Sequence, residues 1–201
     1  YGAHFIRLLE NSLLVQDARI IGDLVRESEL SVAYSKAAAA CKTEFRGETC
    51  NFYGLLKHME STDRAERREA FEKWAALYAD ASAELDAIYD ELVAVRAAMA
   101  EKLGFESYTA LAYRNRQRLD YTPEHVEKFR EQVRTVVTPA VARMFEAQAK
   151  RLGVDKLRYY DESLVFPGGN AHPIGGKDDM LRAAAKMYGA LSPETKEFFD
   201  F

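Results

Sequence analysis

The sequence predicts a mainly α-helical protein, and three observations indicate this class. Apolar residues recur at intervals of three, four and seven along most of the 201 residues. Helix start and stop residues frame these runs, and β-favouring residues gather in only two short places. A hydrophobic content of 48% with 11% aromatic residues is typical of a globular chain.

The net charge and the hydropathy of the sequence argue against two classes of partner. The formal net charge is −4, which argues against a protein built to neutralise nucleic-acid phosphates. No apolar run approaches the roughly 20 residues of a membrane span, and the opening "YGAHFIRLLENS" lacks the layout of a signal peptide. We therefore expect a soluble, cytoplasmic protein with no nucleic-acid and no membrane partner.

The first 60 residues predict small elements. An apolar stripe that includes Phe5, Leu9 and Leu24 predicts two helices before residue 41. "CKTEFRGETCNF" predicts a short hairpin near 41–52, although a plain loop fits nearly as well. Cys41 and Cys50 lack a CxxC spacing, and we interpret them as thiols, with a hairpin disulfide as the alternative in an oxidising compartment. "NFYGLLKHMES" predicts a short helix.

A long helix follows. Asp63 with Glu66 three residues later resembles a capping box. An unbroken apolar stripe then runs from Phe71 to Leu103, and Gly104 supplies the stop. These features predict one helix of about 40 residues, roughly 60 Å long.

Beyond Gly104 the pattern predicts a helix over about 108–118, and then a second long helix that ends near residue 152. Thr122 is its expected cap and Pro123 its first turn, while Pro139 is expected to kink it. We expect it to bury one apolar stripe, which consists of Val126, Phe129, Val133, Val136, Val137, Ala140 and Met144. The two long helices are expected to be antiparallel neighbours.

Residues 158–176 no longer show a helical pattern. The β-favouring "SLVF" predicts a short strand, and "PGGNAHPIGG" predicts an ordered loop whose glycines permit turns beside the prolines. Helix returns over about 178–188, and a last helix begins at Pro193. We treat 1–201 as a single helical segment, with small helices and the hairpin in 1–60 and the long-helix region in 61–201.

Most candidate motifs have ordinary interpretations. The four histidines, His4, His58, His125 and His172, form no H-E-x-x-H pair. "HME" at His58 has the His-x-Glu of a zinc deaminase without its P-C-x-x-C, so chance explains it better. Acid pairs such as Asp86 with Asp90 predict a solvated helix face rather than a carboxylate dyad.

Arginines and tyrosines interleave in "GFESYTALAYRNRQRLDYTPE". Arg114, Arg116 and Arg118 alternate, so on a helix they point to two faces and form no single basic stripe. A packed joint between two helices is therefore favoured over an RNA or DNA surface.

Several segments, in order, resemble the oligoendopeptidase F family, which belongs with the thimet oligopeptidase-like zinc peptidases. They are "STDRAERREAF", "ELDAIYDELVAVRAAMAEKLGFESYTALAYRNRQRLDYT", "VEKFREQVRTVVTPAVARMFEAQAKRLGVDKLRYYDESLVFPGGNAHPIGG" and "KMYGALSPETKEFFDF". The likeness covers at least Phe45 to Phe201.

This resemblance implies an almost wholly helical, clam-like metallopeptidase fold with a deep channel, in which short peptides are hydrolysed with zinc as cofactor. The family's zinc motif, H-E-x-x-H, lies beyond the segment that resembles "SPETKEFFDF". No metal ligand or catalytic residue of the family can be placed on this chain. We therefore expect a segment truncated before the catalytic zinc region, forming part of the channel wall, inactive alone and binding no zinc itself.

Asn170 and His172 are the candidate substrate-cleft residues, because a short strand beside a cleft can pair with an extended peptide. A purely structural role of their loop is favoured over substrate contact. For the whole chain, the alternative function is a non-catalytic helical module that binds peptides or proteins. Helices without their packing partner would expose apolar stripes, so the segment is expected to self-associate or to show a large apolar patch.

Overall fold

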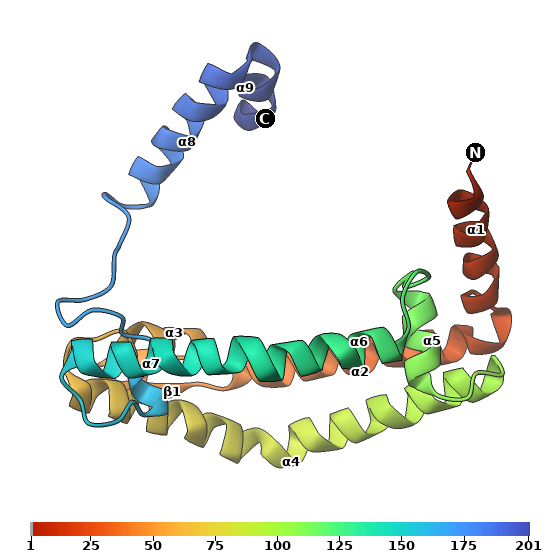
Figure 1. The fold of residues 1–201 in the computed structure, drawn as a ribbon, viewed down its shortest axis with the longest axis horizontal. Coiled ribbons are helices and arrows are strands. Elements are labelled where there is room, and N and C mark those ends of the chain that lie inside the picture. Colours follow the sequence, from red (N-terminus) through yellow and green to blue (C-terminus); the bar gives the residue numbers. More distant parts are fainter. Residues whose placement is uncertain (1) are drawn as a thin grey trace. The chain divides into compact units, whose positions relative to one another are not determined.

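A computed structural model describes residues 2–201, and the chain divides into two compact units (Figure 1). The first unit runs to Pro167 and the second is Gly168–Phe201. The elements of the first unit are α1 (Ala3–Val15), the 3-10 turn η1 (Ala18–Ile20), α2 (Ile21–Ala40), β1 (Thr43–Phe45), β2 (Glu48–Cys50), α3 (Phe52–His58), α4 (Arg64–Lys102), α5 (Tyr108–Asn115), α6 (Pro123–Gln132), η2 (Val133–Val137), α7 (Thr138–Leu152) and η3 (Tyr159–Asp161). The second unit contains α8 (Lys177–Leu191) and α9 (Pro193–Asp200).

The long helix α4 confirms the prediction from its stripe and its end signals. Asp63 caps it by accepting a hydrogen bond from the Ala65 backbone N–H at 2.9 Å, and Gly104 follows its end with φ of 78°. The expected reciprocal capping box is wrong, because the Glu66 side chain binds His58 and Ser61 instead. A tertiary contact has therefore replaced a local one.

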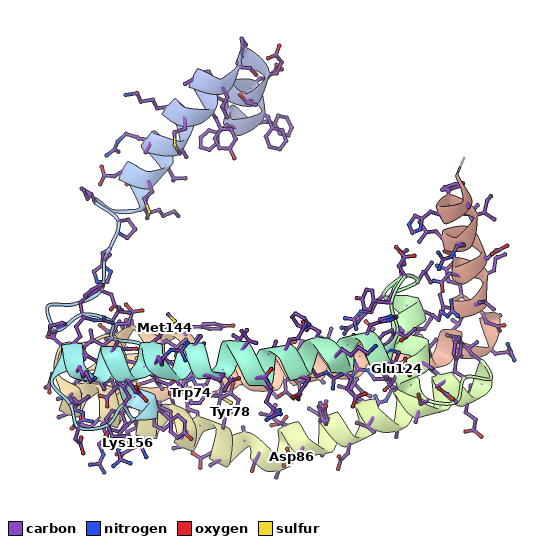
Figure 2. All side chains as sticks on the ribbon, in the orientation of Figure 1. Trp74, Tyr78, Asp86, Glu124, Met144 and Lys156 are labelled. Atoms are coloured by element: carbon purple, nitrogen blue, oxygen red, sulfur yellow. The ribbon has the colours of Figure 1, made fainter. Side chains whose placement is uncertain are left out.

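The antiparallel partner that lies along α4 is α2. Lys102 Nζ contacts Asp23 at 2.6 Å and Arg96 Nε contacts Glu27 at 2.6 Å, so the start of α2 lies beside the end of α4. Such pairs at partly exposed positions contribute little stability but specify which turns face each other. The acids on the outer side of α4, including Asp86 (Figure 2), are exposed, as predicted for a solvated face.

The hairpin and α3 form the first core against α4. Phe45, Leu55 and Ala70 are buried together in this core. Strand pairing is antiparallel, and the turn has φ of 52° at Arg46 and 82° at Gly47, the left-handed pair that a two-residue hairpin turn requires. The predicted hairpin is confirmed, and Cys41 and Cys50 are free thiols.

A second core forms where α4 meets α5, with Met99 and Leu111 buried in it. Nearby, the guanidinium of Arg118 lies 5.0 Å from the ring centre of Tyr113 and 5.9 Å from that of Tyr121. The two rings also meet edge to face at 6.2 Å. Arg118 is therefore part of a packed joint between α5 and α6, as the sequence interpretation favoured.

The predicted second long helix is continuous but not uniform. It comprises α6, the π-helical turn η2 and α7, and the π turn directly precedes Pro139, whose ring nitrogen cannot donate. The predicted burial of its apolar stripe is wrong: Phe129, Val136 and Met144 are 63%, 66% and 67% exposed (Figure 2 labels Met144). The exposure of this stripe agrees with the expectation that the segment shows apolar surface.

The predicted strand at "SLVF" is also wrong. Residues 163–166 form no strand, and η3 and irregular backbone occupy this region. The reason is that side chains of α7, rather than a neighbouring strand, bind the carbonyl groups there. Gln148 donates to Leu164 O at 2.7 Å and Arg151 Nε to Val165 O at 2.7 Å.

The second unit is a helical hairpin. Ser192 caps α9 by accepting from Thr195 N at 3.2 Å, as its Ser-Pro start predicts. The rings of Tyr188 and Phe199 stack at 5.1 Å and join the two helices. Across residues 2–201, no helix combines the length and the hydropathy that a membrane span requires.

The first core offers a matched test of packing. Leu55 is fully buried, whereas its neighbour Leu56 is 41% exposed in the same helix. We expect Leu55→Ala to lower the free energy of unfolding by about 3 kcal/mol and Leu56→Ala by less than about 1 kcal/mol. Urea denaturation followed by circular dichroism measures both, and equal losses would contradict this assignment of the core.

Candidate functional site

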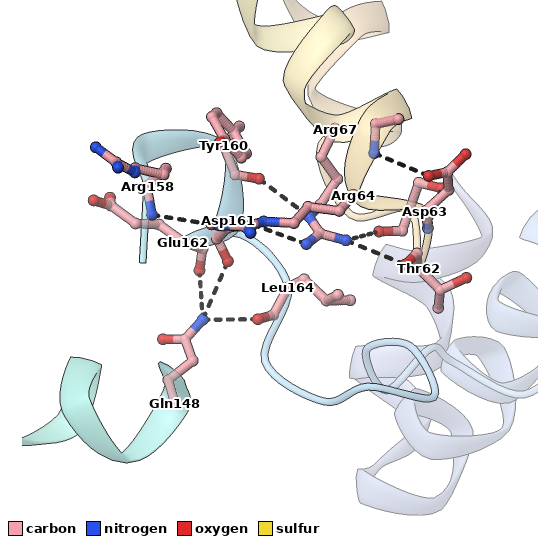
Figure 3. A network of polar contacts seen from close by, with 12 residues as sticks. Thr62, Asp63, Arg64, Arg67, Gln148, Arg158, Tyr160, Asp161, Glu162 and Leu164 are labelled. Carbon is pink, nitrogen blue, oxygen red and sulfur yellow. Dashed lines mark hydrogen bonds and ion pairs between the residues drawn. The ribbon is translucent and has the colours of Figure 1, made fainter. Parts of the chain in front are cut away.

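The buried carboxylate of Asp161 is the centre of a polar network (Figure 3). Its side chain is 0% exposed. Arg67 Nη2 donates to Oδ1 at 2.8 Å, and Arg64 donates to both oxygens at 3.1 and 2.8 Å. The backbone N–H of Arg158 donates to Oδ2 at 3.0 Å. The first turn of α4 is thereby fixed to η3, more than 90 residues later in the chain.

The two arginines determine the direction in which the pKa of Asp161 is shifted. Burial raises the pKa of Asp161, but hydrogen bonds from Arg64 and Arg67 outweigh burial and lower the pKa below its ordinary value of 3.8. Arg67 is 3% exposed in its side chain, and it also donates to the carbonyls of Ser61 and Tyr160. A buried guanidinium with these acceptors has its charge and its donors satisfied.

Helix α7 holds the same segment from another direction. The Gln148 amide is buried and lies 3.4, 3.1 and 2.7 Å from the carbonyls of Asp161, Glu162 and Leu164. Leu164 itself is buried. Because α4 and α7 both bind 158–165, the segment that leads into the glycine-rich loop is fixed although it is neither helix nor strand.

A cavity of about 710 Å³ lies beside this network. Its lining combines aromatic rings with charged side chains of both signs: Arg68, Phe71, Glu72, Lys156, Leu157, Arg158, Tyr159, Tyr160 and Glu162. Phe71 and Tyr159 stack at 6.1 Å, and Arg68 pairs with Glu72 at 2.7 Å. The lining therefore offers aromatic faces together with charged groups of both signs, a combination that can hold a polar chain such as a peptide.

The sequence-predicted residues Asn170 and His172 belong to the second unit. Asn170 is half-buried and His172 is exposed. Gly169 and Gly175 have φ of 105° and 91°, which confirms the interpretation of these two glycines as turn residues. A Cβ at Gly175 would also lie 2.5 Å from the Asp179 carboxylate, which accepts from Gly176 N at the start of α8. The assignment of Asn170 and His172 to a substrate cleft stays a prediction.

The sequence analysis missed Asp161, Arg64, Arg67 and Gln148. One sequence feature could have identified Arg67, because it shares the helical row of Ala70 and carries a charge where the pattern is apolar. No local pattern identifies its partner, since Asp161 ends the short 3-10 turn η3 and is separated from Arg67 by 94 residues.

Comparison with known proteins identifies the class. The model of Peptidase family M3 matches residues 57–165, more than half of the chain. The chain therefore belongs to Peptidase family M3, whose members are generally metal-dependent hydrolases. A search of curated proteins gave no significant match.

Solved structures are similar over 100% of this chain. A protein assigned as oligoendopeptidase F from Bacillus anthracis strain Ames has 38% identity and a TM-score of 0.90, and the chain covers 37% of it. A second oligoendopeptidase F assignment has 40% identity, a TM-score of 0.92 and 35% coverage. PZ peptidase A, solved with an inhibitor, has 40% identity, a TM-score of 0.92 and 36% coverage. The chain thus spans little more than a third of these relatives.

The family's metal chemistry does not fit the residues of this chain. The sequence contains no H-E-x-x-H. Within residues 2–201, the group of potential ligands that lies close together is Glu48, Cys50 and His58, and its thiol and single imidazole differ from the motif that the resemblance implies. No hydrolytic step is assigned to this segment.

The Asp161 network predicts a pH-dependent stability. Because the pKa of Asp161 is lower in the folded than in the unfolded chain, its contribution is complete above the unfolded value and is lost as pH falls through the folded value. We expect Asp161→Asn to lower the free energy of unfolding by about 3 kcal/mol at neutral pH. Below about pH 4, the variant should lose less additional stability than the unchanged chain, because it has no Asp161 carboxylate to protonate. Urea midpoints at both pH values measure this.

The matched control is Asp155→Asn, the same change at an exposed carboxylate in the same connection. It should alter stability by less than about 0.5 kcal/mol. If both variants lose the same stability, Asp161 does not have the structural role assigned to it.

Proposed function

We propose that this chain forms part of the substrate-channel wall of a zinc-dependent oligoendopeptidase that hydrolyses short peptides in the cytoplasm. The observation that carries the proposal is the similarity of every part of the chain to two oligoendopeptidase F assignments and to PZ peptidase A. Zinc, the general base and the groups that stabilise the transition state belong, in this proposal, to residues outside the chain.

In this proposal, the segment contributes by holding residues 158–165 in a fixed position ahead of the glycine-rich loop. The Asp161 network and Gln148 fix residues 158–165, and the glycine-rich loop begins two residues later. A loop with a rigid start can present side chains to a substrate at a small entropic cost. The carbonyls of Leu164 and Val165 are occupied by Gln148 and Arg151, so we assign substrate contact to side chains of the loop rather than to strand pairing.

A non-catalytic peptide-binding module is the second candidate. One observation favours it: the cavity beside Asp161 has aromatic and charged walls that suit a peptide. The two functions differ in their response to a chelator, because only the hydrolase depends on a catalytic metal.

Hydrolysis of a quenched fluorescent oligopeptide separates these functions. We expect the complete gene product to cleave it, a chelator to abolish cleavage and zinc to restore it, while the 201-residue chain is inactive under all conditions. Chelator-insensitive peptide binding without cleavage by the complete product would establish the binding module instead.

Loop side chains are tested in the same assay. In the complete product, Asn170→Ala and His172→Ala should each raise KM several-fold, with kcat changed less, because a lost ground-state contact weakens binding. His4→Ala, at another exposed histidine, is the matched control. Unchanged KM in both loop variants would assign the loop a purely structural role.

A further inference from the structure

Three side chains with metal-binding atoms lie together between the hairpin and α3. A carboxylate oxygen of Glu48, Sγ of Cys50 and a ring nitrogen of His58 are all within 4.8 Å of one another. Glu48 and Cys50 are two residues apart on β2, so their side chains share one face of the strand. We propose that these three side chains bind a divalent metal ion, with Zn²⁺ as the ion that their donor set fits best.

His58 is oriented as a metal ligand. Its Nδ1 lies 2.7 Å from Glu66 Oε1, and Ser61 Oγ donates to Glu66 Oε2 at 2.8 Å. A carboxylate only accepts, so Nδ1 carries the hydrogen and Nε2 has the free lone pair. Nε2 is buried and has no hydrogen-bond partner among residues 2–201. A carboxylate behind the far nitrogen is the arrangement that orients metal-bound histidines.

Helix α3 approaches the sulfur of Cys50 closely. Cys50 is 2% exposed and free. On α3, a Cβ at Gly54 would lie 3.2 Å from Cys50 Cβ and 3.4 Å from Sγ. Glycine is unfavourable inside a helix, so its presence here permits the close approach of α3 to the thiol.

The donor chemistry selects the ion. Thiolate and imidazole favour zinc over magnesium or calcium, which prefer oxygen ligands. Tetrahedral zinc holds such ligand atoms about 3.3–3.8 Å apart. The three atoms already lie within 4.8 Å of one another, so rotation of the side chains can close the group around the ion. Glu48 is exposed and pairs with Lys57, so the ion replaces the Lys57 ammonium as its partner, and solvent can occupy a fourth position.

This site is separate from the zinc chemistry of the family. The resemblance predicts that this chain binds no zinc, because the motif of the family lies beyond it. The site proposed here departs from that prediction, and its donors are a thiolate, an imidazole and a carboxylate on a hairpin and a short helix. All three lie at the edge of the first core, where Cys50 is itself a member. An ion bound there closes the hairpin onto α3 and couples metal binding to folding of this region.

The test uses the 201-residue chain after dialysis against a chelator. Zinc titration in competition with a chromophoric chelator should show one bound ion per chain, and cobalt substitution should give a thiolate-to-metal charge-transfer band. Cys50→Ser should abolish that band and weaken zinc binding by more than about 100-fold. Cys41→Ser, the matched change at the other cysteine, should leave both unchanged.

Three further variants separate ligation from folding. Glu66→Gln should weaken zinc binding about 10–100-fold through His58, whereas Lys57→Met should strengthen it several-fold by releasing Glu48. Glu48→Gln changes an exposed residue, so its weakened binding remains measurable even if Cys50→Ser unfolds. A chain that takes up no zinc, or zinc binding that Glu48→Gln and Cys50→Ser leave unchanged, would overturn the proposal.

Discussion

The burial of the Asp161 carboxylate between Arg64 and Arg67 is the constraint on which the rest of the first unit depends. A carboxylate withdrawn from water is stable only with full compensation, and α4 supplies that compensation from its first turn. Ion pairs to Asp161, rather than regular secondary structure, therefore fix the position of the connection after α7. Removing either partner would leave a buried charge, which is why this contact specifies one arrangement.

The first turn of α4 organises two regions through neighbouring residues. Arg64 and Arg67 bind Asp161, while Glu66 between them binds His58. Successive residues on a helix point in different directions, so one turn can hold η3 on one side and α3 on another. Residues 158–165 and the Glu48–Cys50–His58 group are thus both held by the first turn of α4, although their side chains have different chemistry.

The part of the chain that the family model matches is also the part that the Asp161 network holds together. The family model covers residues 57–165, and this range contains α4, Gln148 and the Asp161 network. These residues hold the backbone of 158–165 in place beside the cavity. The apolar stripe on α6, η2 and α7 remains exposed, as expected where a helix of a larger body lacks its packing partner.

The sequence by itself determined the features that depend on neighbouring residues. Asp63 and Gly104 at the ends of α4, the Arg46-Gly47 turn and Pro123 at the start of α6 act within a few residues, so local patterns predicted them. Only the tertiary structure decided the buried state of Arg67, the partner of Glu66 and the loss of a strand at 163–166. Each of these depends on charges or donors from another element, 5 to 94 residues away along the chain, whose proximity the periodicity of a sequence does not encode.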